Sequence, residues 1–477
     1  MFFNSLQFLW FFGLVWVAYW GLCGGVRRQN LLLLGASYFF YGYWDWRFAG
    51  LILVSTVVDF GCGLALARYA DRSMPRKALL GLSLAVNLGA LGFFKYFNFF
   101  VESASELLAE LGFPGGDWTL QIVLPVGISF YTFQTLSYTI DRYRGQLPAE
   151  RNYLDFAFFV SFFPQLVAGP IVRGRDFLPQ TKAPRRFSWA GQAEGLQLAL
   201  WGLFKKAVVA DNLAPVVDGI FGGDGELGGV VRVLAVYAFT VQIYCDFSGY
   251  TDIARGTARM LGFSFPRNFA QPYFASDPST FWRRWHMTLS TWLRDYLYIA
   301  LGGNRRGTVR TYFNLSMTMV LGGLWHGAAW NYVLWGAYQG LLLVVHRIWR
   351  GPNPSAGQSS LWVRSLKWFC FFQMICFGWL LFRAQSLAEI ERFLAPGDLM
   401  SAQGLNLSEQ AAIGVIIGGL GTLAVLLWDL LLARSASDES PLTHRSPMLQ
   451  AIVCLFLYVG ICLGGSFLGN EFIYFQF

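Results

Sequence analysis

Long apolar stretches alternate with short polar loops along almost the whole chain. In its first third, apolar runs occupy residues 6–24, 30–44, 50–67, 78–100 and 120–140. Further runs lie at 230–249, 366–382, 411–433 and 448–468. An α-helix needs about 20 mainly apolar residues to cross the hydrocarbon core of a bilayer. The pattern therefore predicts an all-α polytopic membrane protein, a single membrane domain over residues 1–477 with roughly ten to twelve helices.

Composition and charge support this class. Hydrophobic residues make up 55% of the chain and charged residues 13%, a balance far from that of an average soluble domain. The formal net charge is +8, but Lys and Arg gather in short clusters between the apolar runs, as positive-inside topology requires. We therefore expect a lipid bilayer as the environment and no nucleic acid as a partner. The cysteines include no CxxC pair, so neither a metal site nor a disulfide framework is predicted.

The charges of the loops predict the orientation of the helices. Basic residues follow the first and third apolar runs, at Arg27, Arg28, Arg68, Arg72, Arg76 and Lys77. The loop over residues 101–119 carries acidic residues and no Lys or Arg. Because short basic loops stay in the cytoplasm, the N-terminus and, counting onward, the C-terminus are both expected outside it. The first run lacks a basic leader and a small-residue cleavage site, so we expect a retained helix.

The apolar run 152–169 differs from the others because basic residues flank it at both ends. They lie at Arg142, Arg144 and Arg151 before it and at Arg173, Arg175, Lys182, Arg185 and Arg186 after it. Irregular backbone, such as that expected at Pro164, Gly169 and Pro170, survives at membrane depth only where protein or a watery cavity satisfies its polar groups. We predict a re-entrant segment beside a cavity open to the cytoplasm. The alternative is a crossing helix whose flanks violate the charge rule.

Polar residues also interrupt the middle of the chain. Lys205 and Lys206 break the moderately apolar stretch 193–213, which we interpret as an interfacial helix or a tilted span. Asp246 and Ser248 end the run 230–249, and the Asp and Arg at 252 and 255 are spaced to pair on one helical face. These residues are candidates for the polar rim of a substrate tunnel. A helix terminus with its cap is the structural alternative.

His286 lies in a segment rich in tryptophan and arginine. The sequence Asp-Pro-Ser at residues 277–279 is a helix-start signature, because Asp or Ser caps the first turn and proline is admissible in it. His286 then shares a helical face with large apolar residues, namely Trp282, Trp285, Leu289, Trp292, Leu293 and Tyr296. Arg283 and Arg284 turn away from this face. We expect His286 to point into protein or bilayer, where a satisfied core histidine is the alternative to a catalytic one.

His326 lies in the motif GGLWHGAAW, within residues 312–344, a stretch without Asp, Glu, Lys or Arg. An ionisable side chain at that depth is costly and indicates function. Small neighbours allow a backbone or substrate to approach closely, and Trp325 and Trp330 frame the imidazole with aromatic walls. A neutral imidazole accepts a proton from a hydroxyl, so His326 is predicted to be catalytic; a bond between helices is the alternative. The remaining two histidines are expected outside this site.

Four motifs carry a family resemblance: QIYCDFSGYTDIARG, FWRRWHMTLSTWLRDYLYI, GGLWHGAAWNYVLWG and the terminal FIYFQF. With them the chain resembles the bacterial polysaccharide branch of the membrane-bound O-acyltransferase (MBOAT) family, which includes proteins of alginate O-acetylation and teichoic-acid D-alanylation. By this resemblance His326 matches the catalytic histidine and His286 a second polar active-site position. The resemblance also implies a ring of helices with re-entrant segments around a central tunnel.

The resemblance implies acyl transfer across the bacterial inner membrane. Acetyl-CoA is expected as the cytoplasmic donor substrate, with no bound cofactor, and a secreted alginate- or cellulose-like polysaccharide as the final acceptor. A periplasmic SGNH-type acetyltransferase or a polysaccharide-synthesis complex is the expected partner. Arg283 and Arg284 are candidates for the donor phosphates, with positive-inside topology as the alternative explanation. D-alanyl transfer from a carrier protein to teichoic acid, a transporter and a purely structural scaffold are the competing functions.

Overall fold

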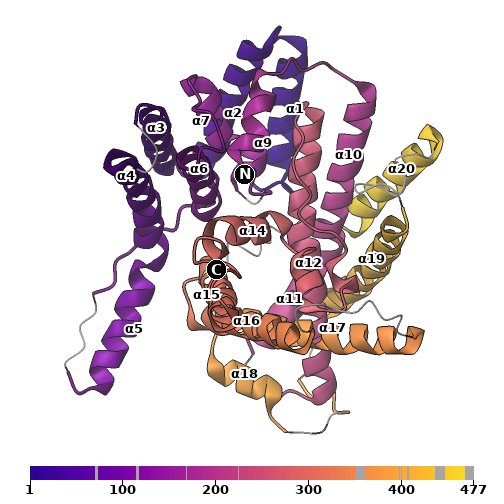
Figure 1. Cartoon of the computed structure of the whole chain (residues 1–477). Coiled ribbons are helices and arrows are strands. Elements are labelled where there is room, and N and C mark those ends of the chain that lie inside the picture. Colours follow the sequence, from indigo (N-terminus) through magenta and orange to yellow (C-terminus); the bar gives the residue numbers. More distant parts are fainter. Residues whose placement is uncertain are drawn as a thin grey trace.

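The computed structural model describes residues 1–69, 73–113, 118–167, 169–223, 225–350, 360–396, 398, 400–404, 408–435 and 446–467. Every regular element within these ranges is a helix, and they contain no strand. Figure 1 shows α3, α4 and α5 on one side of the molecule and α19 and α20 on the other. The all-α fold predicted from the apolar runs is confirmed.

Six helical stretches in the described part of the chain are long and apolar enough to cross a membrane. They are Val26–Ala65, Met74–Glu110, Gly229–Met260, Leu361–Arg383, Glu409–Ala433 and Pro447–Gly464. A shorter apolar helix, α1 (Leu6–Gly21), precedes them. Large apolar side chains remain exposed on their outer faces, as at Leu420, which is 64% exposed. A surface of this kind is suited to lipid contact, so the chain is a multi-pass membrane protein.

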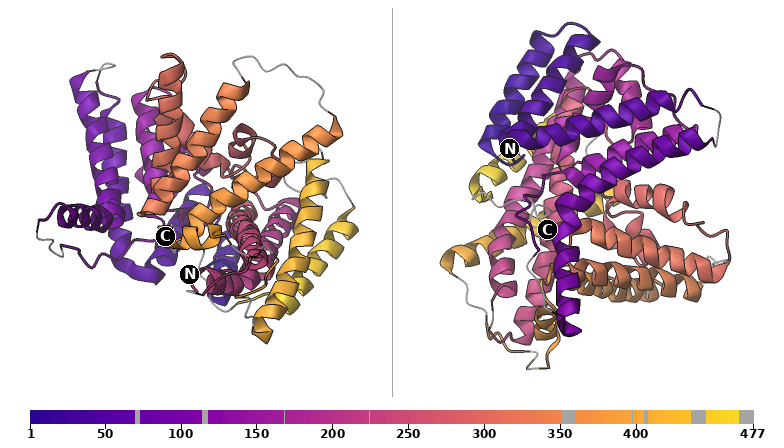
Figure 2. Two further views of the ribbon diagram at one scale, coloured as in Figure 1. Left: turned by 90° about the horizontal axis from the view of Figure 1, so that it is seen from below. Right: turned by 90° about the vertical axis from the view of Figure 1, so that its left-hand side faces the viewer.

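The N-terminal third forms a group of long helices. Val26–Ala65 comprises α2 (Val26–Asp45) and α3 (Ala49–Ala65), joined by the short helix Trp46–Phe48. Met74–Glu110 comprises α4 (Met74–Leu91) and α5 (Phe97–Glu110), joined by a π-helical turn at Gly92–Tyr96. The next helix, α6 (Ile128–Tyr143), packs against α3 and α4 and is buried over almost its whole length. Figure 2 shows α4 and α5 at the edge of the molecule.

The run at 152–169 folds as two short helices and not as one span. The helix α7 (Tyr153–Ser161) ends at Phe162, and α8 (Phe163–Leu166) follows it directly. Nine residues of α-helix rise only about 14 Å, roughly half of the hydrocarbon thickness. The amide of Asn30 donates to Asp155 Oδ1 and to the carbonyl of Thr181, both at 2.9 Å. The start of the run and the segment after it therefore lie close together, which is compatible with the re-entrant prediction. Its cavity open to the cytoplasm stays a prediction.

Lys205 and Lys206 lie in the protein interior and not on a water-facing surface. Whether the stretch 193–213 is interfacial or a tilted span stays a prediction. A continuous helical segment runs through α10 (Trp189–Leu203), a π-helical turn (Phe204–Ala210) and α11 (Asp211–Phe221). It packs against α12 (Gly229–Met260), which crosses the middle of the molecule (Figure 1). Both lysines pair with carboxylates, Lys205 with Asp252 at 2.6 Å and Lys206 with Asp246 at 2.5 Å. The predicted pairing of Asp252 with Arg255 is also present, at 3.5 Å.

The remaining helices include α15, α16 and α17, which carry His326 and its aromatic neighbours Trp335 and Phe382. In chain order they are α9 (Gly174–Lys182), α13 (Pro278–Trp282), α14 (Met287–Trp292), α15 (Thr308–His326), α16 (Trp330–Arg350), α17 (Leu361–Arg383), α18 (Leu387–Leu394), α19 (Glu409–Ala433) and α20 (Pro447–Gly464). The hairpin of α15 and α16 packs closely through glycines. A Cβ atom at Gly323 would overlap the carbonyl oxygen of Tyr332, and one at Gly336 would overlap that of Met319. The small residues near His326 thus serve close helix contact, as predicted.

Candidate active site

The chain around His286 departs from the single helix expected over residues 279–296. Asp277 caps α13 by accepting the backbone N–H of Thr280 at 2.8 Å, as the start signature predicts. The helix then stops before His286, whose backbone is left-handed (φ 42°, ψ 54°), and α14 begins at Met287. The N–H of Met287 donates to the carbonyl of Asn268 at 2.9 Å. The segment around Asn268 therefore pairs with the backbone N–H of Met287, which a continuous helix would have paired internally.

Asn268 determines which nitrogen of His286 carries the proton. Asn268 Oδ1 accepts the backbone N–H of Thr288 at 3.1 Å and its hydroxyl at 2.9 Å. A backbone N–H can only donate, so this atom is the amide oxygen and can only accept from His286 Nδ1, 3.1 Å away. His286 is fully buried, and its Nε2 has no hydrogen-bond partner among the described residues. The Nε2 lone pair is therefore available.

His326 is the last residue of α15 and is 4% exposed. Its ring lies among aromatic side chains, with ring centroids 5.1 Å from Trp325, 5.2 Å from Trp335 and 5.5 Å from Phe382. The centroid of Trp325 also lies 6.0 Å from that of His286. The structure thus brings the two predicted histidines together around one indole, although 40 positions separate them in the sequence.

Two residues of α6 hold Trp325 in place. The centroids of Phe130 and Phe133 lie 5.5 Å and 5.4 Å from that of Trp325. Phe133 also stacks on Trp292 at 3.8 Å, and Trp292 Nε1 donates to the carbonyl of Phe133 at 2.9 Å. These contacts join α6, α14 and α15 beside the histidines, and aromatic pairs of this kind add stability beyond the apolar area they bury.

A cavity of about 490 Å³ borders His326. It is lined by residues from the N-terminal segment, the end of α2, the start of α6, and by Lys95, Trp325 and His326. Lys95 was not among the site residues predicted from the sequence. It is a lone charge inside the apolar run 78–100, and the rule that singled out His326 as an intramembrane ionisable residue applies to it equally.

The other predicted substrate-binding residues lie away from this cavity. Asp246 and Ser248 belong to the buried ion network of α12, where Ser248 accepts from Lys205 Nζ at 2.9 Å. Trp330 is 62% exposed and donates to Ser103 Oγ at 3.2 Å. None of these residues lines the cavity, and their contact with substrate stays a prediction.

The two predicted arginines occupy the turn after α13. Arg283 is exposed and donates to Ser279 and Thr280 of that helix, at 3.3 Å and 3.0 Å, while Arg284 is half-buried. Neither lines the cavity, and their contact with donor phosphates also stays a prediction. His346 lies nearby, 3.8 Å from Asp277, so it is outside the site as expected; His444 falls outside the described residues.

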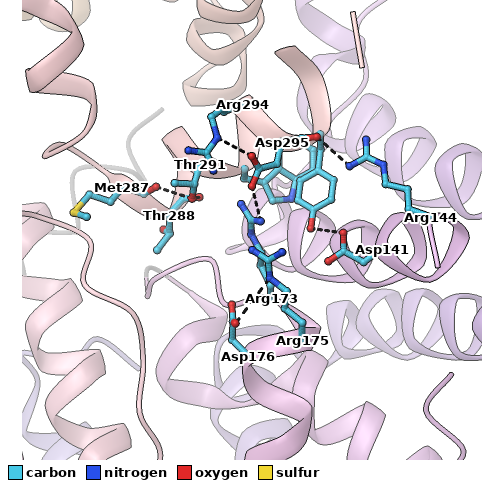
Figure 3. A network of polar contacts seen from close by, with 12 residues as sticks. Asp141, Arg144, Arg173, Arg175, Asp176, Met287, Thr288, Thr291, Arg294 and Asp295 are labelled. Carbon is cyan, nitrogen blue, oxygen red and sulfur yellow. Dashed lines mark hydrogen bonds and ion pairs between the residues drawn. The ribbon is translucent and has the colours of Figure 1, made fainter. Parts of the chain in front are cut away.

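A polar network lies at the end of α6 farthest from the cavity (Figure 3). Arg173 and Arg294 each bond Asp295 at 2.7 Å, and Arg144 donates to its carbonyl at 3.1 Å. Partial burial by itself raises the pKa of the Asp295 carboxyl, but the hydrogen bonds and charges of Arg294 and Arg173 outweigh that effect and hold the pKa below its usual range. Arg175 stands beside this network. The result is an arginine-rich face.

Comparison with known proteins places the chain in a family. The family model described as MBOAT, membrane-bound O-acyltransferase family, matches residues 146–383, which include both histidines. A probable alginate O-acetylase AlgI from Azotobacter vinelandii is 44% identical over 394 residues, covering 81% of this chain and 76% of that protein. The chain belongs to the membrane-bound O-acyltransferase family. It is therefore a multi-pass membrane O-acyltransferase.

Other members of the family show how far the similarity extends. A peptidoglycan O-acetyltransferase from Helicobacter pylori is 32% identical over 491 residues, covering 94% of this chain and 91% of that protein. A teichoic acid D-alanyltransferase from Bacillus subtilis is 28% identical over 279 residues, covering 54% of this chain and 68% of that protein. The similarity to the two proteins named for O-acetylation thus covers more of this chain than the similarity to the one named for D-alanyl transfer.

Proposed function

We propose that this protein transfers the acetyl group of cytoplasmic acetyl-CoA toward a secreted polysaccharide of the alginate type. The observation that carries the proposal is the pair of buried histidines around Trp325, one of them bordering a cavity. Relatives named as alginate O-acetylases, at 44% identity over most of the chain, support acetyl as the group and a polysaccharide as the final acceptor.

The loop charges support a position of the cavity on the extracytoplasmic side. The cavity is lined by Phe40, Tyr41, Tyr43 and Trp44, at the end of α2 opposite to Arg27 and Arg28, and by residues 124–130, which follow the acidic stretch 101–119. Short basic loops stay in the cytoplasm, so these lining segments lie at the outer ends of their helices. The acceptor hydroxyl is proposed to enter through this cavity and reach His326 from outside.

Acetyl transfer to the acceptor hydroxyl needs a general base and the thioester of acetyl-CoA. His326 accepts the proton of the acceptor hydroxyl as its oxygen bonds to the thioester carbonyl carbon. The tetrahedral intermediate collapses, the carbon–sulfur bond breaks, and the leaving thiolate takes up a proton to become free CoA. His286 is proposed to help, because the Asn268 contact leaves its Nε2 lone pair free to share a proton or orient the reacting groups.

The donor is proposed to bind at the arginine-rich face around Asp295. Because Arg144 ends the helix that begins at the cavity, this face lies on the cytoplasmic side of the bilayer in the same orientation. Arg175 and Arg294 are 46% and 61% exposed, and together with Arg283 and Arg284 they offer guanidinium groups for phosphate oxygens. A central tunnel is proposed to connect this face to the histidines.

Two further points belong to the same proposal, and a second candidate function stands beside it. The protein resides in the inner membrane of a bacterium. Its acetyl group passes to a periplasmic SGNH-type acetyltransferase or a polysaccharide-synthesis complex, or directly to the glycan. D-alanyl transfer is the second candidate, and the relative named for it matches this chain over a shorter length. It predicts transfer from a charged carrier protein and no turnover of acetyl-CoA.

Thiol release from acetyl-CoA by the purified protein tests the proposal. We expect His326→Ala to lower turnover by about 10²-fold or more, the usual contribution of a positioned general base. His346→Ala is the matched control, because this histidine lies outside the cavity, and it should retain wild-type turnover. His326→Ala with wild-type turnover would refute the catalytic assignment. Flux of acetyl-CoA or polymer without covalent transfer would instead indicate a transporter.

A further inference from the structure

The C-terminal end of α15 presents backbone carbonyls next to the cavity. The last four carbonyls of an α-helix have no partner within the helix and need donors from elsewhere. Here α15 ends at His326, and Gly327 leaves the helix in an extended conformation (φ −156°, ψ 152°). The residue that ends the helix is therefore the one that carries the imidazole. Donors that bind these carbonyls therefore also fix the position of the His326 backbone.

Two consecutive residues of another helix supply the donors. Lys95 Nζ donates to the carbonyls of Trp325 and His326, both at 2.8 Å. The hydroxyl of Tyr96 donates to the carbonyl of Leu324 at 2.9 Å. Three successive carbonyls of the last turn of α15 therefore receive hydrogen bonds from one pair of side chains. Lys95 also lines the cavity beside His326.

The backbone of the donor helix is suited to this contact. Lys95 and Tyr96 lie in the π-helical turn Gly92–Tyr96, where α4 passes into α5. Neighbouring side chains on a regular helix point in different directions, whereas these two reach the same helix end. Isolated π-helical turns occur frequently at functional sites. An ammonium group at the C-terminal end of a helix is also favoured electrostatically, because the helix dipole is negative there.

We propose that Lys95 and Tyr96 are positioning residues that clamp the C-terminal end of α15 and hold His326 at the cavity. The inference rests on the proposed catalytic role of His326. Neither side chain takes part in bond making; each fixes the backbone from which the imidazole projects. A displacement of about 1 Å at a reacting group can lower a rate by about 10²-fold, so loosening this clamp should affect the chemical step more than donor binding.

Kinetics of clamp variants with acetyl-CoA test the proposal. We expect Lys95→Met to lower kcat by about tenfold to 10²-fold with little change in the KM for acetyl-CoA, and Tyr96→Phe to lower it less, because one bond is lost. Lys95→Arg keeps the positive charge and the donors and should recover most of kcat. Lys77→Met is the matched control, because Lys77 is exposed and does not line the cavity; it should retain wild-type kcat.

Chemical rescue separates a lost clamp from general damage. Propylammonium supplies the atoms that Lys95→Ala removes beyond Cβ, and the cavity of about 490 Å³ gives it access. We expect added propylammonium to restore turnover of Lys95→Ala in a saturable way and to leave His326→Ala inactive. If Lys95→Met accumulates poorly, this rescue measurement still tests whether Lys95 acts as a clamp.

The outcomes distinguish this inference from the proposed function. Wild-type kcat in Lys95→Met, with His326→Ala inactive, would overturn the clamp and leave the function standing. Wild-type turnover in His326→Ala would overturn the proposed function itself. A raised KM for the acceptor at unchanged kcat in Lys95→Met would show that Lys95 binds substrate, which also contradicts a positioning role. Failure of propylammonium to rescue Lys95→Ala would count against the clamp as well.

Discussion

At the scale of single residues, the protonation of His286 is decided by a neighbour that donates nothing to it. The backbone N–H and the hydroxyl of Thr288 both donate to Asn268 Oδ1. Because a backbone N–H can only donate, the Asn268 atom facing His286 is the amide oxygen. That oxygen then accepts the proton on His286 Nδ1, which leaves the second nitrogen with a lone pair in a fully buried site. A buried histidine whose tautomer is set in this way is prepared to share a proton.

We therefore predict that Asn268→Ala lowers kcat by about tenfold or more, because both tautomers of His286 become accessible and the proton-sharing arrangement is lost. Thiol release from acetyl-CoA measures the effect. Asn212→Ala is the control, because the amide of Asn212 bonds the carbonyls of Val208 and Gly464 in another part of the fold. Equal kcat in both variants would show that the tautomer of His286 does not matter to the reaction.

At the scale of elements, buried charges join the segment α10–α11 to α12. Lys206 Nζ lies 2.8 Å from Asp211 and 2.5 Å from Asp246, and all three side chains are almost fully buried. Lys205 makes a parallel link to Asp252. These pairs explain how two lysines are tolerated inside a membrane domain, where an unpaired ionised group would be costly.

Lys206→Met should therefore destabilise the protein, because two buried carboxylates lose their cation. Breaking a buried ion pair from one side costs about 3 to 5 kcal/mol. The expected result is a lower midpoint of thermal unfolding in detergent and reduced accumulation in the membrane. The exposed Lys77→Met variant provides the comparison. If both variants unfold at the wild-type temperature, the network contributes nothing to stability.

At the scale of the whole molecule, the orientation in the membrane follows from the short loops. Asp155, near the start of the run 152–169, and Thr181, beyond its end, meet at Asn30, a few positions after the basic pair Arg27 and Arg28. The tertiary contacts bring both ends of the run together, and the charge rule predicts that they lie on the cytoplasmic side of the bilayer.

Single cysteines at Gln146 and Arg186, both exposed positions, test this orientation in a variant that lacks the native cysteines. Both should react with a membrane-impermeant maleimide only after the cytoplasmic membrane has been permeabilised. The acidic stretch 101–119, predicted as a loop, is helical up to Glu110, where α5 ends. A cysteine placed at the exposed Glu106 of α5 is the control and should react in intact spheroplasts. Labelling of one flank from each side would mean that residues 152–169 cross the bilayer.

Apolar periodicity and loop charge determined the class of the protein and much of its local structure. Runs of apolar residues indicate burial in lipid or protein without knowledge of any partner, so the helices, the break in the run 152–169 and the burial of His326 were predictable. The capping contact of Asp277 and the pairing of Asp252 with Arg255 were also predictable, because they act over three residues. The motifs around His286 and His326 further indicated the MBOAT family, which the comparisons confirm.

The tertiary structure alone decided the interactions between distant segments. His286 leaves the helix because the backbone of residues 268–270 pairs with its flanking residues. Lys206 is buried because Asp246, on another helix, offers a counter-charge. Lys95 acts on carbonyls about 230 positions away. A local sequence pattern indicates whether a side chain is buried. It does not indicate which atoms the side chain contacts, because those contacts depend on how the helices pack in three dimensions.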